Sequence, residues 1–126
     1  MSTKHNNPYS ALKQIFHEPN RLAIMSALVN AQDGISFNDL KEECNLTDGN
    51  LSRHLQMLGK ARVIRIKKSF VNNKPRTTIF LSDRGRESFL EYLQALDEVL
   101  RMAAEALPKS EKTASLLLPL SKAVRV

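Results

Sequence analysis

The stretch from Thr47 to Lys60 limits the possible folds of this chain more than any other. Its leucines, Leu51, Leu55 and Leu58, recur at helical spacing and leave one narrow apolar stripe. Thr47 can cap such a helix, because its hydroxyl accepts a hydrogen bond from a free backbone N–H of the first turn. We therefore expect a helix that packs its leucines on a core and exposes a polar side.

The polar side of this helix carries the donors that DNA-contacting helices use. Long cationic and amide side chains reach base edges and phosphates in a major groove. We expect three residues to read bases, and Arg53 is the best candidate for a bidentate contact with guanine: Asn50, Arg53 and Gln56. Four others are expected to position the helix on phosphate: Thr47, Ser52, His54 and Lys60. His54 flanks the leucine stripe, so packing is an alternative role for it.

A shorter helix is predicted just before this one, from Asn38 to Cys44. Ser36 is its candidate cap, and residues 35–37 are expected to be extended. Two short helices joined by three or four residues form the helix-turn-helix arrangement. The alternative for the second helix alone is an ordinary amphipathic surface helix, so its neighbours decide the interpretation.

Two more helices are predicted upstream. Pro8 opens a short amphipathic helix that ends at Glu18 and Pro19. Pro19 then begins a second helix through about Val29, with so little polar surface that we expect it at the centre of the core.

A β-hairpin is predicted directly after the helix-turn-helix. Two β-branched runs, 63–66 and 77–81, flank residues 72–76, and Pro75 lacks a backbone donor where no ladder bond is needed. Such a hairpin is a wing, which lies along the DNA backbone or the neighbouring minor groove. Its expected DNA contacts, with Arg76 a candidate for the minor groove, are Lys67, Lys68, Lys74 and Arg76. The alternative is a solvated hairpin whose lysines discourage edge pairing.

The charge distribution supports a polyanionic partner. The chain carries a formal charge of +6 over 126 residues. Residues 53–86 contain ten Lys and Arg against Asp83 alone, a net +9, so the remainder is −3. Because a solvated face usually mixes both signs, this block favours a binding surface.

A long last helix is predicted from the cap Ser82 to about Leu107, before Pro108. At 1.5 Å per residue it is about 36 Å long, more than a domain of this size covers, so we expect a homodimer. The interface residues follow a heptad rhythm: Phe89, Leu93, Leu96, Leu100, Ala103 and Leu107. The alternative is that the helix folds back along its own domain, and part of it is expected to do so. Its acidic residues would disfavour contact with phosphate.

These residues resemble a known family. Leu51-Ser52-Arg53-His54-Leu55 followed by Leu58 is similar to the recognition helix of the bacterial and archaeal winged helix-turn-helix transcriptional regulators near the MarR and ArsR groups. Lys68-Ser69-Phe70-Val71, Pro75-Arg76-Thr77-Thr78 and Leu81-Ser82-Asp83-Arg84-Gly85-Arg86 resemble their wing and the start of their last helix. The resemblance covers about residues 19–100. It implies a dimer on a pseudo-palindromic operator, with the long helix in the interface.

Two positions depart from that family. Many relatives have Ala-Gly-Leu-Val where this chain has Ala61-Arg62-Val63-Ile64. Arg62 must therefore adopt a costly conformation or the helix must end another way. Metal-sensing members carry a cysteine cluster, whereas Cys44 is the only cysteine here. We therefore expect neither metal regulation nor any metal or other cofactor.

The fold class expected is mainly α with a small β-hairpin. The domains are a winged helix-turn-helix domain at 8–82, with its wing at about 63–81, a dimerisation helix at 83–107, and a tail at 108–126 with one short helix. The function expected is a sequence-specific regulator, a repressor or activator, on double-stranded DNA. No set of residues identifies a small-molecule effector.

Competing functions are weaker. A winged-helix module that binds an acidic protein is the alternative, although protein-binding faces are richer in aromatics. RNA binding would need stacking aromatics, and an enzyme would need a catalytic constellation that these residues do not supply. No apolar run resembles a signal peptide or membrane span, so we expect a cytoplasmic protein that makes no membrane contact.

Overall fold

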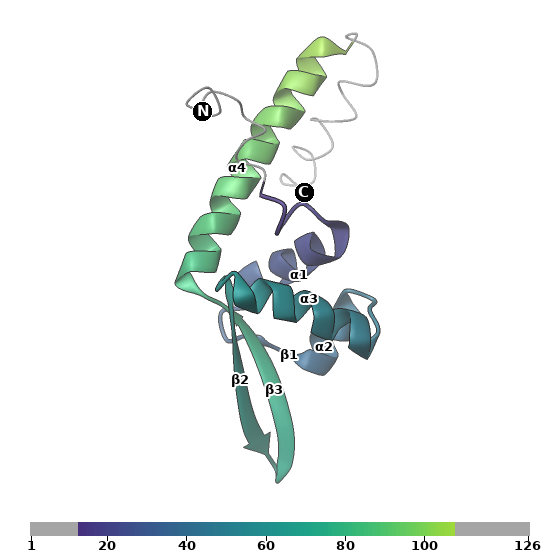
Figure 1. Cartoon of the computed structure of the whole chain (residues 1–126), viewed down its shortest axis with the longest axis vertical. Helices are drawn as coiled ribbons and strands as arrows, with labels where there is room; N and C mark the ends of the chain where they lie inside the picture. Colours follow the sequence, from purple (N-terminus) through teal and green to yellow (C-terminus); the bar gives the residue numbers. More distant parts are fainter. Residues whose placement is uncertain (1–12, 108–126) are drawn as a thin grey trace, which may run out of the picture. The chain divides into compact units, whose positions relative to one another are not determined.

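A computed structural model describes residues 13–107 of the chain (Figure 1). The elements in order are α1 (Pro19–Val29), β1 (Ile35–Ser36), α2 (Phe37–Glu43), α3 (Asp48–Lys60), β2 (Ile64–Val71), β3 (Lys74–Leu81) and α4 (Asp83–Ala106). Residues 13–92 form one compact unit, and the described residues from Leu93 onward belong to another. The predicted mainly α fold with a hairpin and a long last helix is confirmed.

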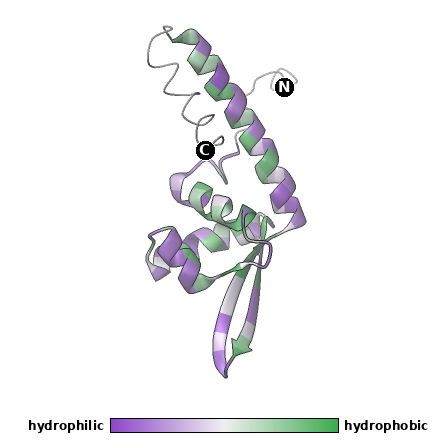
Figure 2. Cartoon of the chain, turned by 180° about the vertical axis from the view of Figure 1, so that it is seen from behind, coloured by the Kyte–Doolittle hydropathy of each residue, from purple (hydrophilic) through white to green (hydrophobic). Residues whose placement is uncertain are grey.

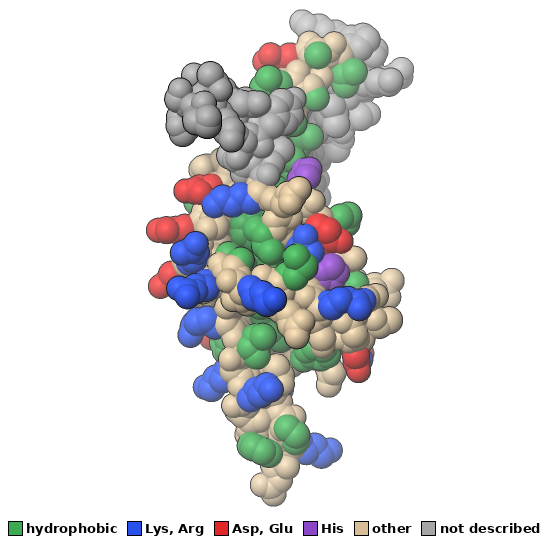
Figure 3. All heavy atoms as spheres, viewed as in Figure 1, with side chains coloured by type: hydrophobic (Ala, Val, Ile, Leu, Met, Phe, Trp, Pro, Cys, Tyr) green, Lys and Arg blue, Asp and Glu red, His purple; other side chains and the backbone are tan. Residues whose placement is uncertain are grey.

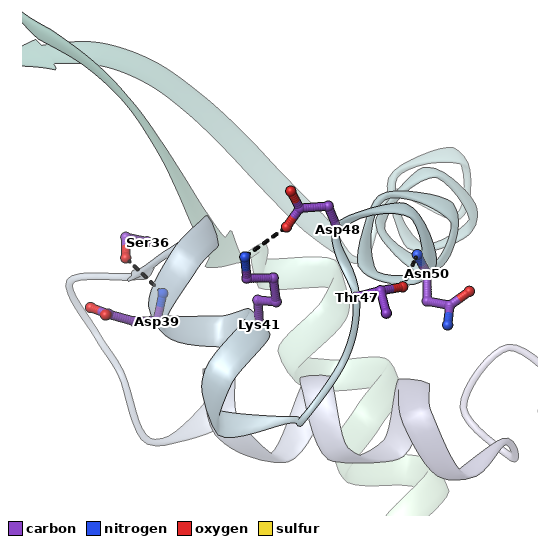
Figure 4. A network of polar contacts seen from close by, with 6 residues as sticks. All are labelled: Ser36, Asp39, Lys41, Thr47, Asp48 and Asn50. Carbon is purple, nitrogen blue, oxygen red and sulfur yellow. Dashed lines mark hydrogen bonds and ion pairs between the residues drawn. The ribbon is translucent and has the colours of Figure 1, made fainter.

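Side-chain caps begin three of these helices as the sequence predicts. The Thr47 hydroxyl accepts a hydrogen bond of 3.2 Å from the Asn50 N–H, and the Ser36 hydroxyl accepts one of 3.1 Å from the Asp39 N–H (Figure 4). At α4, the Ser82 hydroxyl accepts from the Gly85 N–H at 2.9 Å. These caps satisfy backbone donors that the helices leave free, and they set where α2, α3 and α4 start.

The ends of α2 and α3 repeat one motif. In α2, the N–H groups of Asn45 and Leu46 bond back to Glu42 and Lys41, and Asn45 has φ +55°. In α3, the N–H groups of Arg62 and Val63 bond back to Gly59 and Leu58, and Arg62 has φ +64°. Both are Schellman ends with a left-handed residue, which suits asparagine but strains arginine. The first of the two outcomes expected for Arg62, the costly conformation, is the one observed.

The core of the 13–92 unit lies where α1, α2, α3 and the base of the sheet meet. Its buried side chains come from the four helices, the two long strands and the segments next to them: Phe16, Ile24, Met25, Leu28, Leu40, Leu51, Leu55, Leu58, Val63, Ile64, Ile79, Leu81, Phe89 and Tyr92. The leucine stripe of α3 therefore faces inward as predicted.

The first half of α4 contributes an aromatic cluster to this core. Phe89 is only 2% exposed and packs edge to face on Phe16 at 5.3 Å between ring centroids, and Tyr92 stacks on Phe89 at 5.9 Å. A side chain buried in its own domain cannot also face a partner chain, so the prediction of Phe89 in a dimer interface is wrong. The expected packing of part of this helix on its own domain is observed.

The segment before α1 differs from the predicted short helix. Residues 14–16 form a turn, closed by hydrogen bonds from the N–H groups of Phe16 and His17 to the Lys13 carbonyl. The Glu18 carboxylate then caps α1 by accepting from the Arg21 N–H at 2.7 Å, with Pro19 as the first helical residue. The start predicted for that short helix, at Pro8, lies outside the described residues, as does the tail at 108–126.

The two strands of the hairpin are longer and its turn is tighter than predicted, although the hairpin spans nearly the predicted residues. The sheet has the order β1-β3-β2, and the two residues Asn72 and Asn73 join β2 to β3 with φ +55° and +65°. Positive φ at both positions is the type I′ hairpin turn, which asparagine tolerates. Lys74, Pro75 and Arg76 are therefore strand residues, with Val71 paired to Lys74 next to the turn. Hydrogen-bonded and non-hydrogen-bonded pairs alternate along the ladder from that closing pair. Pro75 belongs to a non-hydrogen-bonded pair, so its missing backbone N–H removes no bond to β2.

Candidate nucleic-acid interface

The outer side of α3 presents the predicted polar residues to solvent. Ser52, Arg53, Gln56 and Lys60 are exposed, and Asn50 is half-buried. Arg53 donates a hydrogen bond to the Asn50 side-chain oxygen, three residues before it. Two of the expected base-reading residues therefore lie together on the exposed face of the helix.

His54 has a different environment from the other residues expected on phosphate. It is half-buried, and its Nδ1 lies 3.4 Å from Nη1 of Arg21 in α1. The Arg21 guanidinium also donates to the carbonyl of Ile15 at 2.7 Å. Because arginine has only donors, His54 Nδ1 must be the acceptor in this contact. This contact favours the packing role that the position of His54 beside the leucine stripe left open.

The turn between α2 and α3 is braced by an ion pair. Lys41 Nζ lies 2.8 Å from an Asp48 carboxylate oxygen, next to the Thr47 cap (Figure 4). Asp48 is also the first residue of α3, where a negative charge complements the helix dipole. These contacts fix the angle at which α3 leaves the turn, and hence the direction of its exposed face.

The hairpin register sorts the basic residues of the wing onto two faces. Residues alternate across a strand, so Lys67, Lys74 and Arg76 share a face, while Lys68 lies on the other. Arg65 joins the first group, with its guanidinium 5.6 Å from the ring centroid of Phe80 opposite it. Arg65 was not among the wing contacts expected from sequence. Its place within a run of basic residues was the available signal, but strand pairing was needed to assign it a face.

Four basic side chains of the wing therefore share one face: Arg65, Lys67, Lys74 and Arg76. A space-filling view shows Lys and Arg side chains from α3 along the wing (Figure 3). Lys67, Lys68, Lys74 and Arg76 are all exposed. An open groove of about 380 Å³ lies between the start of α2 and the wing, lined in part by Asn38, Lys74 and Arg76. Side chains of this kind bind phosphate oxygens.

The end of α3, the start of the wing and the start of α4 are tied together. The Ser82 hydroxyl donates to the Arg62 carbonyl at 2.8 Å, and the Ser82 N–H donates to the Val63 carbonyl at 3.1 Å. These bonds cross from the residue before α4 to two of the three residues between α3 and β2. The wing is thereby held at a fixed place relative to α3.

The second half of α4, from Leu93, exposes apolar side chains at several of the positions predicted for a dimer interface. Leu93 and Leu100 are each 38% exposed, Ala103 is exposed, and Leu96 and Leu107 are half-buried. Arg101 and Asp97 form an exposed i,i+4 pair at 3.0 Å.

Cys44 has the properties of a structural thiol. Burial, and secondarily the Glu43 carboxylate, raises the pKa of the Cys44 thiol. A thiol with a raised pKa stays protonated at neutral pH and is a poor nucleophile. Within residues 13–107 no three His, Cys, Asp or Glu side chains gather as a metal site would require, and no helix there is apolar and long enough to cross a membrane.

Comparisons with known proteins agree with this geometry. A family model described as winged helix DNA-binding domain matches residues 20–100. An uncharacterized protein of Methanocaldococcus jannaschii is 36% identical over 90 residues, which cover 71% of this chain and 94% of that protein.

Two solved structures have the same fold. A transcriptional regulator homologue of Pyrococcus horikoshii OT3 superposes with a TM-score of 0.69 and 27% identity, over 75% of this chain and 94% of that one. MepR, a transcription regulator of the Staphylococcus aureus multidrug efflux pump MepA, superposes with a TM-score of 0.62 over 98% of this chain and 92% of that one. At 17% identity, the likeness to MepR shows the fold alone.

Proposed function

The chain belongs to the winged helix DNA-binding domain family, and we propose that this DNA-binding regulator acts as a homodimer on a pseudo-palindromic operator. The observation that carries the proposal is the pairing of two surfaces within one rigidly tied unit. The polar face of α3 is exposed beside a wing whose exposed charged side chains are all basic.

In the proposed complex, α3 enters the major groove and supplies the sequence preference. Asn50, Arg53 and Gln56 read base edges, and Arg53 is suited to a bidentate contact with guanine O6 and N7. Thr47, Ser52 and Lys60 contact phosphate from the same helix. His54 supports the helix from behind through Arg21 and does not contact DNA directly.

The wing supplies affinity that does not depend on sequence. Lys67, Lys68, Lys74 and Arg76 neutralise phosphates and release counterions. Arg65 acts with them, because it lies on the same face as three of these residues. Lys74 and Arg76 also line the groove between α2 and the wing, so this groove is expected to accept a phosphate of the DNA backbone.

The homodimer is proposed to form through the second half of α4. Apolar side chains there and at the residue that follows the helix recur at the spacing of helices that pack along each other: Leu93, Leu96, Leu100, Ala103 and Leu107. For two copies of α3 to enter successive major grooves on one side of the duplex, the half-site centres lie about 34 to 36 Å apart.

A selection of bound fragments from a genomic library tests this proposal. We expect the recovered duplexes to share two inverted half-sites whose centres are about one helical turn apart. Recovery of one unrepeated half-site would contradict the dimer but not DNA binding, and recovery of no enriched sequence would contradict sequence-specific regulation.

The dimer has its own test and control. Leu100→Asp is expected to convert a dimer to a monomer in sedimentation equilibrium, whereas Glu98→Gln, also exposed on α4, should leave it a dimer. A wild-type monomer at micromolar concentration would overturn this part of the proposal.

A second candidate is a winged-helix module that binds an acidic protein. The exposed apolar side chains of Met57 in α3 and Phe70 in β2 favour it, since both types occur in protein interfaces. A gel-retardation assay with genomic DNA fragments at moderate salt separates the two functions. Retardation supports the regulator, and its absence supports the protein-binding module.

A further inference from the structure

The end of the wing carries an aromatic side chain that its own domain does not cover. Phe70 is 75% exposed, more than any other large hydrophobic residue in the described part of the chain. Of the eight residues of β2, only Ile64 at its base is buried. Phe70 is six residues further along the strand, so it contributes nothing to the core. Its ring is therefore free to contact a partner of the wing.

The hairpin register gives Phe70 an apolar neighbour. Phe70 pairs with Pro75 across the ladder, one pair before the closing pair Val71–Lys74. The closing pair of a two-residue turn is hydrogen-bonded, so Phe70 and Pro75 form a non-hydrogen-bonded pair, in which side chains lie closest. Figure 2 shows hydrophobic residues at the end of β2 beside a hydrophilic turn. We call Phe70 and Pro75 the apolar tip.

The charges around the apolar tip identify the chemistry of its partner. Lys68 lies two residues before Phe70 on the same face, whereas Lys74 and Arg76, the sequence neighbours of Pro75, lie on the opposite face of the hairpin. All three are exposed, and no acidic residue occurs between Arg53 and Leu81. An apolar group with cations on both sides fits the DNA minor groove, where base steps lie between two rows of phosphates.

From these observations we propose that the apolar tip is a wedge that enters the minor groove and separates two stacked base pairs. The proposal rests on the DNA-binding function above. Phenylalanine and proline are among the side chains that open base steps in this way, and the opened step kinks the duplex toward the major groove. The bend would press the neighbouring major groove onto α3. The basic residues of the wing hold the phosphates while the ring enters.

The wedge also adds sequence preference at a site that α3 never touches. Pyrimidine–purine steps such as TA and CA unstack most readily. An operator for this protein is therefore expected to place such a step beneath each wing, outside the bases read by Asn50, Arg53 and Gln56.

Plasmid topology tests the wedge without knowledge of the operator. A closed circular plasmid is relaxed with a type I topoisomerase in the presence of saturating protein, the protein is removed, and the linking number is measured. Opening of base steps unwinds the duplex, so we expect the full-length wild type to lower the linking number. Phe70→Ala is expected to lose this shift while it still retards the plasmid.

Two variants serve as controls. Phe70→Leu keeps an apolar wedge and is expected to keep the shift. Val71→Ala removes an exposed apolar side chain from the opposite face of the same tip and is also expected to keep it. Phe70 is exposed, so neither of its substitutions should affect folding.

The outcomes distinguish this inference from the proposed function. If the wild type retards the plasmid but leaves its linking number unchanged, or if Phe70→Ala shifts it as the wild type does, the wedge is wrong and DNA binding stands. If Val71→Ala lost the linking-number shift as fully as Phe70→Ala does, the wedge would also be wrong. If the wild type binds no duplex at all, the proposed function itself fails.

Discussion

A Cβ atom placed on Gly85 would lie 1.9 Å from the carbonyl oxygen of Val63. The first turn of α4 therefore passes the start of β2 with no room for a side chain. The same carbonyl accepts the Ser82 N–H, and the neighbouring Arg62 carbonyl accepts the Ser82 hydroxyl. This close contact joins the end of the recognition helix, the wing and the last helix at one point.

Gly85→Ala is expected to lower the free energy of unfolding by about 2 to 3 kcal/mol, because backbone and not a flexible side chain must move. Urea denaturation followed by circular dichroism measures it. Gly59→Ala is the matched control: a Cβ there meets nothing within 4 Å, and alanine should raise stability by up to about 1 kcal/mol. Equal effects of the two substitutions would show that the contact with Val63 does not exist.

Arg62→Gly is expected to stabilise the protein relative to Arg62→Ala by about 1 kcal/mol. Both changes remove the guanidinium, but only glycine adopts φ +64° without a steric penalty. Thermal and urea unfolding of the two variants measure the difference. If Arg62→Ala were the more stable, the left-handed end of α3 would be incorrect.

Local signals in the sequence predicted most of the fold. Thr47, Ser36 and Ser82 bond to backbone groups three residues away, so their types and positions alone indicated the helix starts. The leucine stripe of α3 likewise depends only on helical spacing. These features lie within one turn of the chain and need no knowledge of distant residues.

Features that depend on pairing between distant residues were missed. Arg65 and Lys68 lie on opposite faces by strand alternation alone, but the register with β3 decides which of them shares a face with Lys74 and Arg76, and a shift of one residue would exchange them. Phe89 fits the heptad rhythm of a partner-facing stripe equally well, but Phe16, 73 positions earlier, covers it. The steric need for Gly85 likewise depends on Val63 across the fold.

Stability is expected to fall as the pH rises above about 10, the ordinary pKa of tyrosine. Burial raises the pKa of Tyr92, whose hydroxyl shares a hydrogen bond of 3.0 Å with His17 Nδ1. A raised folded-state pKa means that the folded protein keeps its proton where the unfolded chain loses it. The stabilisation by the neutral hydroxyl is therefore complete below pH 10 and is lost as the pH approaches the folded-state value.

Urea unfolding between pH 8 and 11 measures this dependence, and Tyr92→Phe should flatten it. The tyrosinate absorbance of the wild type minus that of Tyr92→Phe gives the titration of Tyr92 directly, since the chain has only two tyrosines. A midpoint at or below the ordinary value would contradict the burial of the hydroxyl.

The roles proposed for α3 and the wing predict two kinds of DNA-binding defect. Arg53→Ala should cost about 1 to 3 kcal/mol on the selected operator and relax the preference at one base pair. Lys68→Ala should weaken binding to all duplexes similarly and lower the slope of log affinity against log salt by about 1. Fluorescence anisotropy with operator and scrambled duplexes at several salt concentrations measures both.

Arg53→Lys is the control that separates charge from geometry. Lysine keeps the positive charge near the phosphates but lacks the planar fork that contacts two acceptors of one guanine, and it cannot reproduce the fixed geometry of the bond to Asn50. We therefore expect Arg53→Lys to bind scrambled DNA as the wild type does and to lose preference on the operator as Arg53→Ala does. If Arg53→Lys retained the operator preference, Arg53 would act on phosphate, and the reading of bases would fall to Asn50 and Gln56.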